Sequence, residues 1–499
     1  MTRRAPSILA SAALAAALLA PRGAGAKEAS PYADRARCRP ATTIADVAPR
    51  PVPEWYALYL NGKKVGWIEA HSTAGTREGK AIRVYRQEML VEAVVGPRTV
   101  QRRAREERVY EARKGGRLLS MSTVFGGDGG DRTVQVDCGP RTCTARVTAA
   151  DGNRTTEIPH PGEAIEQADA TRLAALTCGS VSGPQLQAED LRVKRMTDRF
   201  TGRSTAGGGG VEVPVSVVEQ SEDGDRTASR VLVADDGRLL ETRIGDGMVI
   251  RLEPEETARR LDLVDLFTML RVPLPGPLPR DVPMTITFGL RGVPPGFDLR
   301  DERQSVAPGP GGETVLTVVA RPPSGPDVPR GKPAEKGDPD QAATIDVDWD
   351  HPSIRKLAQA TVGGTTGTWA AARKINAEVY RRLDKVYGQS RDRASEILAQ
   401  GKGDCTEHTR LFVALARASG IRAREVKGLV YASYGQGGPG LYWHAWPEVK
   451  VGDGWVAMDP TFGQDVADAT HVALGRGARQ DAVALVGSLS VTRAEPRKP

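Results

Sequence analysis

Residues Gly401–Gln464 combine a helix start, a glycine-rich run and two short strand patterns. Apolar residues within Leu411–Ala418 repeat with helical spacing, and Gly420 is a typical helix stop. Asp404 directly precedes the first turn and is a suitable N-cap. Cys405 therefore begins the predicted helix, where free backbone N–H groups and the helix dipole favour a thiolate. The common alternative is a small buried cysteine that packs as a hydrophobic residue.

Two strand patterns follow this helix, and they contain a histidine and an aspartate. Leu441–Lys450 alternates as a strand that includes His444, and Trp455–Asp459 is a second short strand. A loop centred on Val451-Gly452 would place His444 opposite Asp459, and a loop centred one residue later would make them diagonal neighbours. A tight loop on Asp453-Gly454 would separate them by four residues.

The side chains of Cys405, His444 and Asp459 suit the roles of a nucleophile, a general base and an orienting acid, in that order. If they meet, His444 takes the thiol proton and later protonates the leaving group. Asp459 then orients the imidazole ring and stabilises its charged form. Each residue alone is weak evidence, so the hypothesis depends on the combination.

Residues 365–475 resemble the transglutaminase-like superfamily of papain-fold thiol enzymes, of the bacterial exported type with an N-terminal β-rich region. The motifs are GDC before a helix, followed by GIRAR, HAW and DPT. The resemblance implies that Cys405 is the nucleophile, His444 the general base and Asp459 the orienting acid. It also implies Trp369 as an oxyanion donor together with the backbone N–H of Cys405, although a tryptophan before a helix is more often part of a core. Arg422 stands where the family often has proline, which we interpret as a surface change.

The length of 499 residues predicts at least two domains. The predicted fold class is α+β, with an N-terminal antiparallel β domain followed by a transglutaminase-like (papain-like) α+β catalytic domain. Helices are expected at 352–361, 366–386 and 391–399. The predicted segments are a signal peptide at 1–26, an irregular segment at 27–54, a β-rich domain at 55–305, a Pro/Gly-rich linker at 306–341, the transglutaminase-like domain at 342–475 and a C-terminal tail at 476–499.

The first 26 residues have the pattern of a cleavable signal peptide. Arg3 and Arg4 precede an apolar run at Ile8–Ala20, and small residues end the segment. We therefore expect a periplasmic or secreted protein without a transmembrane anchor. Removal of three arginines lowers the formal charge from +7 to +4. Because charges of both signs are interspersed, the sequence gives no support for nucleic-acid binding.

Five cysteines in an exported chain suggest two disulfides and one free thiol. Cys138 and Cys143 flank a turn and could form a local bridge, and Cys38 and Cys178 could form the second. Cys405 would then be the free thiol, although other pairings are open.

The sequence indicates no metal or cofactor. Cys405 and His408 are one helical turn apart and could bind zinc together with His444 and Asp459, but structural zinc sites usually have a second paired cluster. His408 is more simply a packing residue or a group that supports the site. Two calcium-like patterns, at 126–131 and 346–357, lack the repeats or the glycine and glutamate that such sites need.

Together these features predict an exported cysteine-dependent enzyme that acts on amide bonds of a protein or peptide substrate, including one in the cell envelope. The enzyme would be a peptidase or amidase, or it would catalyse a transglutaminase-type acyl transfer, in each case through a thioester intermediate. The alternative is a non-catalytic envelope module that keeps the transglutaminase-like fold for binding or assembly.

Overall fold

The structure is a computed structural model, and the predicted signal peptide lies outside the residues that it describes. Among the described residues, one unit comprises 38–93 and 101–264, and the other comprises 94–100 and 265–497. No described helix is both long and apolar enough to cross a membrane. The described residues are 38–39, 43–95, 98–113, 116–127, 131–149, 152–208, 211–223, 228–279, 284–294, 297–333, 338–386, 393–434, 438–476, 485 and 487–497.

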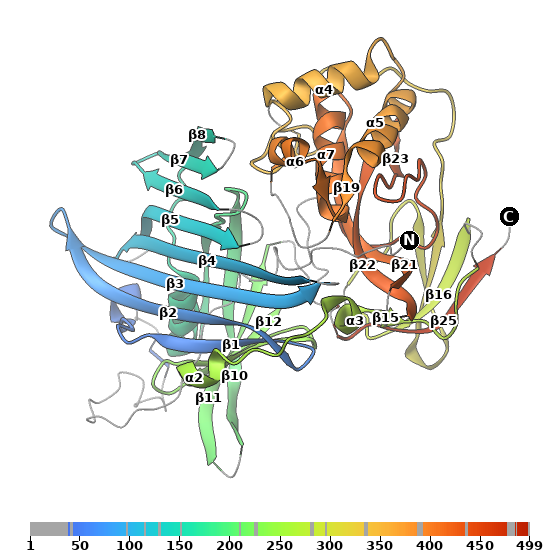
Figure 1. Cartoon of the computed structure of the whole chain (residues 1–499). Coiled ribbons are helices and arrows are strands. Elements are labelled where there is room, and N and C mark those ends of the chain that lie inside the picture. The colour runs from blue at the N-terminus through green and yellow to red at the C-terminus, as the bar shows by residue number, and fades with distance from the viewer. Residues whose placement is uncertain are drawn as a thin grey trace. The chain divides into compact units, whose positions relative to one another are not determined.

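The first unit is built on a 14-stranded sheet with the order β8-β7-β6-β5-β4-β3-β2-β1-β14-β13-β12-β11-β10-β9 (Figure 1). Its first eight and last six strands each run in sequence order, and the β1–β14 pair joins the two sets. The strands are β1 (Glu54–Leu60), β2 (Lys63–Arg77), β3 (Lys80–Val95), β4 (Arg98–Glu111), β5 (Arg117–Gly127), β6 (Arg132–Cys138), β7 (Thr142–Ala149), β8 (Gly152–Pro159), β9 (Ser180–Leu186), β10 (Val193–Gly208), β11 (Val211–Glu222), β12 (Ser229–Ala234), β13 (Leu239–Ile244) and β14 (Met248–Leu252).

Local sequence explains how this sheet begins. Asn61 and Gly62 form the two-residue turn between β1 and β2, and both have positive φ angles (48° and 74°). Such a turn matches the twist of the strands that it joins. Helix α1 (Gln167–Thr177) connects β8 to β9 and packs against strands β9–β12. The short helices η1 (Ile44–Asp46) and α2 (Glu255–Ala258) complete this unit.

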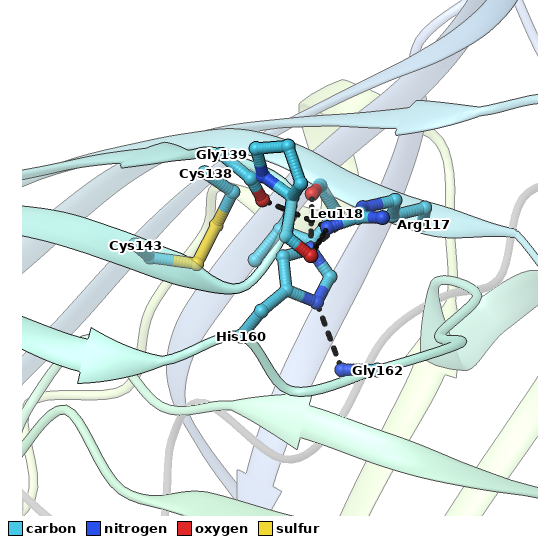
Figure 2. The surroundings of a disulfide bond; sticks show 8 residues. Arg117, Leu118, Cys138, Gly139, Cys143, His160 and Gly162 are labelled. Atoms are coloured by element: carbon cyan, nitrogen blue, oxygen red, sulfur yellow. Dashed lines mark hydrogen bonds between the residues drawn. A yellow bond between two sulfur atoms is a disulfide. The ribbon is translucent and has the colours of Figure 1, made fainter.

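Both predicted disulfides are present, and Cys405 is the free cysteine. Cys38 is bonded to Cys178, and Cys138 is bonded to Cys143 across the β6–β7 turn. Figure 2 shows the second bridge beside His160. The backbone N–H of Gly162 donates to Nδ1 of His160 at 2.9 Å. Because both sulfur atoms are bonded to each other, this cluster does not offer thiolates to a metal.

The second unit has a helical half that surrounds α7. Its core consists of apolar residues from α4, α5, α6 and α7 with Val449 and Val456 from the neighbouring strands. The predicted helices are confirmed with shifted ends. The helices are α3 (Leu266–Leu270), η2 (Pro310–Gly312), α4 (Pro352–Val362), α5 (Thr368–Arg382), α6 (Ala394–Gln400) and α7 (Cys405–Ala418).

Three sheets complete this unit. The five-stranded sheet has the order β15-β22-β21-β24, with β23 paired to β22, and it packs against α7. A four-stranded sheet has the order β17-β18-β16-β25, and β19 and β20 form a short parallel pair. The strands are β15 (Val272–Pro273), β16 (Thr285–Arg291), β17 (Gln304–Pro308), β18 (Thr314–Val319), β19 (Asp384–Lys385), β20 (Lys402–Gly403), β21 (Ala423–Tyr434), β22 (Gly438–Val451), β23 (Gly454–Ala457), β24 (Val472–Arg476) and β25 (Ser490–Arg497).

The chain divides near residue 264, so the predicted extent of the β-rich domain to residue 305 differs from the structure. Strand β16 pairs with β25, which lies in the predicted C-terminal tail at 476–499. This pairing of distant segments ties residues 285–319 to the C-terminal unit. Local sequence could not reveal it because the partners are about 200 residues apart.

The predicted linker at 306–341 is also structured in its described part. Pro310–Gly312 forms the turn between β17 and β18, which lies inside that range. Farther along, the Asp327 carboxylate accepts the backbone N–H groups of Trp369 and Ala370 at the start of α5. Arg330 donates to the carbonyl of Ser419 at the end of α7. The described part of this stretch therefore forms one turn and binds the ends of two helices.

Gly428→Ala should destabilise the C-terminal unit. A Cβ atom at this position on β21 would lie 2.1 Å from the carbonyl oxygen of Val472 and 2.7 Å from the Trp446 ring. We expect a loss of about 1–3 kcal/mol in the free energy of unfolding, measured by urea titration. Gly364→Ala is the control because its Cβ would meet no atom within 4 Å. Equal stability of the two variants would contradict the close approach at Gly428.

Candidate active site

Helix α7 places Cys405 at its first position, as predicted. The side chain of Asp404 accepts the backbone N–H of Thr406 at 2.9 Å, and the Glu407 carboxylate accepts the N–H of Asp404 at 2.7 Å. This reciprocal capping box fixes the first turn of the helix. The Cys405 side chain is therefore presented from a rigid, buried helix start.

The surroundings of Cys405 do not favour the thiolate that its helix position predicted. Burial raises the pKa of the Cys405 thiol well above its usual range, and the nearby Asp404 carboxylate adds to this rise. The backbone N–H of Ala445 on β22 opposes it by hydrogen bonding to the sulfur. Cys405 is only 2% exposed. The cost of burying a charge exceeds the benefit of the helix dipole, so the isolated thiol is neutral at pH 7.

Strand β22 brings His444 to Asp459. The two-residue loop Gly452-Asp453 joins β22 to β23, because Val451 pairs with Gly454. This is the predicted register in which His444 and Asp459 are diagonal neighbours. Nε2 of His444 lies 2.8 Å from Oδ2 of Asp459, and both residues are buried.

The Asp459 carboxylate binds four donors. Its Oδ1 accepts the backbone N–H groups of Thr461 and Phe462 at 2.6 and 3.1 Å. Its Oδ2 lies 2.8 Å from Nε2 of His444 and 3.0 Å from Nε2 of His471. Burial raises the pKa of Asp459, but the two histidines more than offset it and hold this pKa well below its usual range. Asp459 is therefore ionised at neutral pH.

His471 is the residue of this site that sequence reasoning missed. It lies in the loop before β24, and its Nδ1 is 3.1 Å from Oδ1 of Asp468. Burial lowers the pKa of His471, but the carboxylates of Asp468 and Asp459 raise it to about 9. The loop has no periodic pattern that could have signalled this position. Only its buried contact with the His444–Asp459 pair identifies it.

Aromatic rings hold the two histidines in place. The ring of Phe462 stacks on His444 with centroids 4.9 Å apart and an interplanar angle of 10°. Trp446 meets His471 edge-on at 5.1 Å. These contacts restrict rotation of both imidazoles, which keeps their nitrogen atoms directed at Asp459.

Two other predicted residues have different surroundings. Nδ1 of His408 lies 2.7 Å from the carbonyl oxygen of Asp404, and burial lowers the pKa of His408 to about 4. His408 is thus a neutral, buried residue in the first turn of α7. Trp369 is partly buried against the helical core, and its backbone N–H binds Asp327. Its role as an oxyanion donor stays a prediction.

The residues that the structure brings together differ from the four ligands that the zinc hypothesis names. Among the described residues, His444, Asp459 and His471 have ligand atoms within 4.8 Å of one another, and His408 is not part of this group. Nε2 of His444 and Nε2 of His471 each lie within hydrogen-bond distance of Oδ2 of Asp459. Proton sharing thus accounts for the arrangement.

Residues 355–460 match the family model described as the transglutaminase-like superfamily. They form a transglutaminase-like domain. The match agrees with the α+β fold expected for this part of the chain, and it contains Cys405, His444 and Asp459. His471 lies outside the matched range of the transglutaminase-like domain. No curated protein matches the sequence.

Three solved structures are similar to parts of this chain. A candidate cysteine protease from Cytophaga hutchinsonii is 19% identical, with 43% of this chain and 86% of that chain covered and a TM-score of 0.28. A β-barrel-like protein with a domain of unknown function from Brucella abortus is 12% identical, with 41% and 96% covered and a TM-score of 0.29. A candidate protease from Parabacteroides distasonis is 10% identical, with 69% and 68% covered and a TM-score of 0.17. Because these scores are low, the case for a function of the transglutaminase-like domain rests on its own geometry.

His471 should make the stability of the folded protein depend on pH. Its folded pKa of about 9 exceeds the ordinary value of 6.5. The protonated ring therefore stabilises the fold fully below pH 6.5, and this contribution is lost as the pH rises through about 9. The shift corresponds to roughly 3 kcal/mol. We expect the free energy of unfolding, from urea titrations, to fall between pH 6.5 and about 9.5.

His471→Gln is the control for this pH dependence, because glutamine keeps a donor for Asp459 but does not titrate. The variant should lose clearly less stability than the parent protein over the same pH range. If both proteins lose the same amount, the titration belongs to other groups.

Chelation should leave the site unchanged. We expect metal analysis of the purified protein to give substoichiometric zinc, because protons already link the potential ligands. Alkylation of Cys405 should proceed at the same rate before and after treatment with a chelator. Stoichiometric zinc whose removal changes this rate would instead make His444, Asp459 and His471 a metal site.

Proposed function

We propose that the protein is an exported cysteine-dependent enzyme that acts on amide bonds through a Cys405–His444–Asp459 triad and a thioester intermediate. The contact between Nε2 of His444 and Oδ2 of Asp459, at 2.8 Å, carries this proposal. The Cys405 thiol accepts a hydrogen bond from the backbone N–H of Ala445, the residue after His444, and the charge of Asp459 raises the pKa of this thiol. These contacts support the assignment of a nucleophile, a base and an orienting acid to one buried site.

In the first half-reaction the Cys405 sulfur attacks the carbonyl carbon of an amide. Nε2 of His444 faces Asp459, so Nδ1 is the ring nitrogen that takes the thiol proton. The new S–C bond produces a tetrahedral oxyanion. The C–N bond then breaks, His444 gives the same proton to the leaving nitrogen, and an acyl thioester remains on Cys405.

In the second half-reaction water or an amine attacks the thioester carbon. His444 takes the proton of the attacking group, the S–C bond breaks, and the proton returns to the Cys405 sulfur. Water gives hydrolysis, as in a peptidase or amidase, and an amine gives a new amide bond, as in a transglutaminase. Neither half-reaction calls for a metal or a cofactor.

The start of α7 supplies a donor for the oxyanion. The first N–H groups of a helix have no partner within the helix. The Asp404 carboxylate binds those of Thr406 and Glu407, and the N–H of Cys405 is therefore the one proposed to meet the substrate oxygen. We propose Trp369 as the second donor.

Export is proposed from the first 26 residues and is consistent with the two disulfides of the β-rich unit. The substrate would then be a protein or peptide outside the cytoplasm, including the cell envelope. The β-rich unit would present that substrate or anchor the enzyme to a scaffold.

The burial of Cys405 favours one alternative of another class. A thiol that is 2% exposed and neutral also suits a non-catalytic envelope module that uses the fold for binding or assembly. Such a module would tolerate the loss of the thiol, whereas an enzyme would not.

Cys405→Ala should abolish turnover in the purified protein. The assay combines a diverse peptide mixture with a fluorescent primary amine, and mass spectrometry detects both cleaved peptides and amine-labelled glutamines. We expect a loss of at least about 1,000-fold, because without a thiol no thioester forms. His444→Ala should have an effect of the same order.

Thr406→Ala is a matched control on the neighbouring residue of α7, and circular dichroism checks that every variant is folded. Absence of turnover in the parent protein, together with an unchanged cellular phenotype of Cys405→Ala, would favour the binding module.

A further inference from the structure

We propose that His471 is a positioning residue: a side chain that is protonated at neutral pH, shares the Asp459 carboxylate with His444 and sets the pH range of the Cys405–His444 pair. This inference rests on the proposed function, since it concerns the same site. The triad itself does not require a second histidine on Asp459.

Geometry supports the charge on His471. Its Nε2 lies 3.0 Å from Oδ2 of Asp459, and its Nδ1 lies 3.1 Å from Oδ1 of Asp468. A neutral imidazole carries only one N–H, whereas the charged form donates from both nitrogens. Both ring nitrogens of this buried residue face carboxylate oxygens, so the arrangement fits the charged form. The rise of its pKa to about 9 agrees with this.

The partner of His471 is itself held in place. Asp468 accepts hydrogen bonds from the side chain of Gln464 and from the backbone N–H of Thr470, both at 2.8 Å. Gln464 in turn exchanges two backbone hydrogen bonds with Asp459, at 2.8 and 2.9 Å. The loop from Asp459 to His471 therefore fixes both carboxylates around the ring.

The other charged and titratable groups near His471 come from several elements. His444 on β22 is the nearest, with ring centroids 5.7 Å apart. Arg303, which precedes β17, donates to the backbone carbonyl of Asp468 at 2.8 Å. Helix α7 contributes Cys405 and His408, both of which sense the Asp459 charge.

The sign of the effect follows from charge alone. A nearby positive charge makes it easier for the Cys405–His444 pair to lose a proton. Removal of the positive charge of His471 must therefore shift the ionisation of the Cys405–His444 pair to higher pH. At a separation of about 6 Å and an effective dielectric constant near 20, the shift is about one to two pH units.

The test is the rate of Cys405 alkylation by iodoacetamide between about pH 5 and pH 10, located by peptide mapping. His471→Gln should move the midpoint of the pH–rate curve upward by about one to two units. His408→Gln is the matched control, because it removes a buried but neutral histidine and should leave the midpoint unchanged. A His471→Gln curve with the parent midpoint, or an equal shift in both variants, would overturn the proposal.

Nitrogen NMR of the parent protein with labelled histidine tests the charge without any substitution. Both ring nitrogens of His471 should be protonated at about pH 7.5, and a single protonated nitrogen would contradict the inference. His444→Ala separates this proposal from the proposed function. If that variant alkylates like the parent, the triad itself fails; if it slows while His471→Gln keeps the parent midpoint, only the role of His471 fails.

Discussion

The Asp459 carboxylate is the group on which the geometry of the site depends. A buried carboxylate is tolerated only when hydrogen bonds and opposite charges replace its hydration. Here two backbone N–H groups bind one oxygen, and His444 and His471 bind the other. Each such bond to a charged group contributes about 1.5–3 kcal/mol. The loop after β23 and the orientation of both rings follow from this single ion.

The sheet brings His444, on β22, and the loop that carries His471 to that ion. On β21, Gly428 pairs with His444 of β22 on one side and with Ala473 of β24 on the other. Since Gly428 has no side chain, Trp446 and the backbone of Val472 occupy the space beside it. Close packing of three strands thus sets the distance between His444 and the loop that carries His471. The stability of the sheet and the geometry of the site are therefore coupled.

Local signals were enough to predict the helix with Cys405 and its cap. The Asp404 N-cap, the apolar spacing and Gly420 all lie within or directly beside α7, so the local sequence predicts them well. The sequence permitted two β22–β23 loops that bring His444 near Asp459 without demanding either, and the structure adopts the one that leaves His444 and Asp459 diagonal.

Features that depend on contacts between distant parts of the chain could not be predicted from local sequence. The predicted linker is part of the C-terminal unit because its strand β18 pairs with β16, which in turn pairs with β25, and because Arg330 binds the end of α7. His471 belongs to this class, because only the fold brings it to Asp459. The pKa of the Cys405 thiol also depends on the fold. Local sequence predicts the helix dipole, but it does not predict the burial of Cys405, which has the larger effect on this pKa.

The neutral state of Cys405 bears directly on how the proposed chemistry would proceed. Each unit by which burial raises a thiol pKa costs about 1.4 kcal/mol for formation of the free thiolate. A separate ionisation step would add this cost to the barrier. Transfer of the proton to His444 during attack avoids it, because the sulfur never carries a full negative charge alone. Asp459 and His471 already form an ion pair beside His444, so the new imidazolium arises next to balanced charges that need no rearrangement. In the proposed mechanism, one proton moving between neighbouring groups is therefore enough to activate a buried thiol.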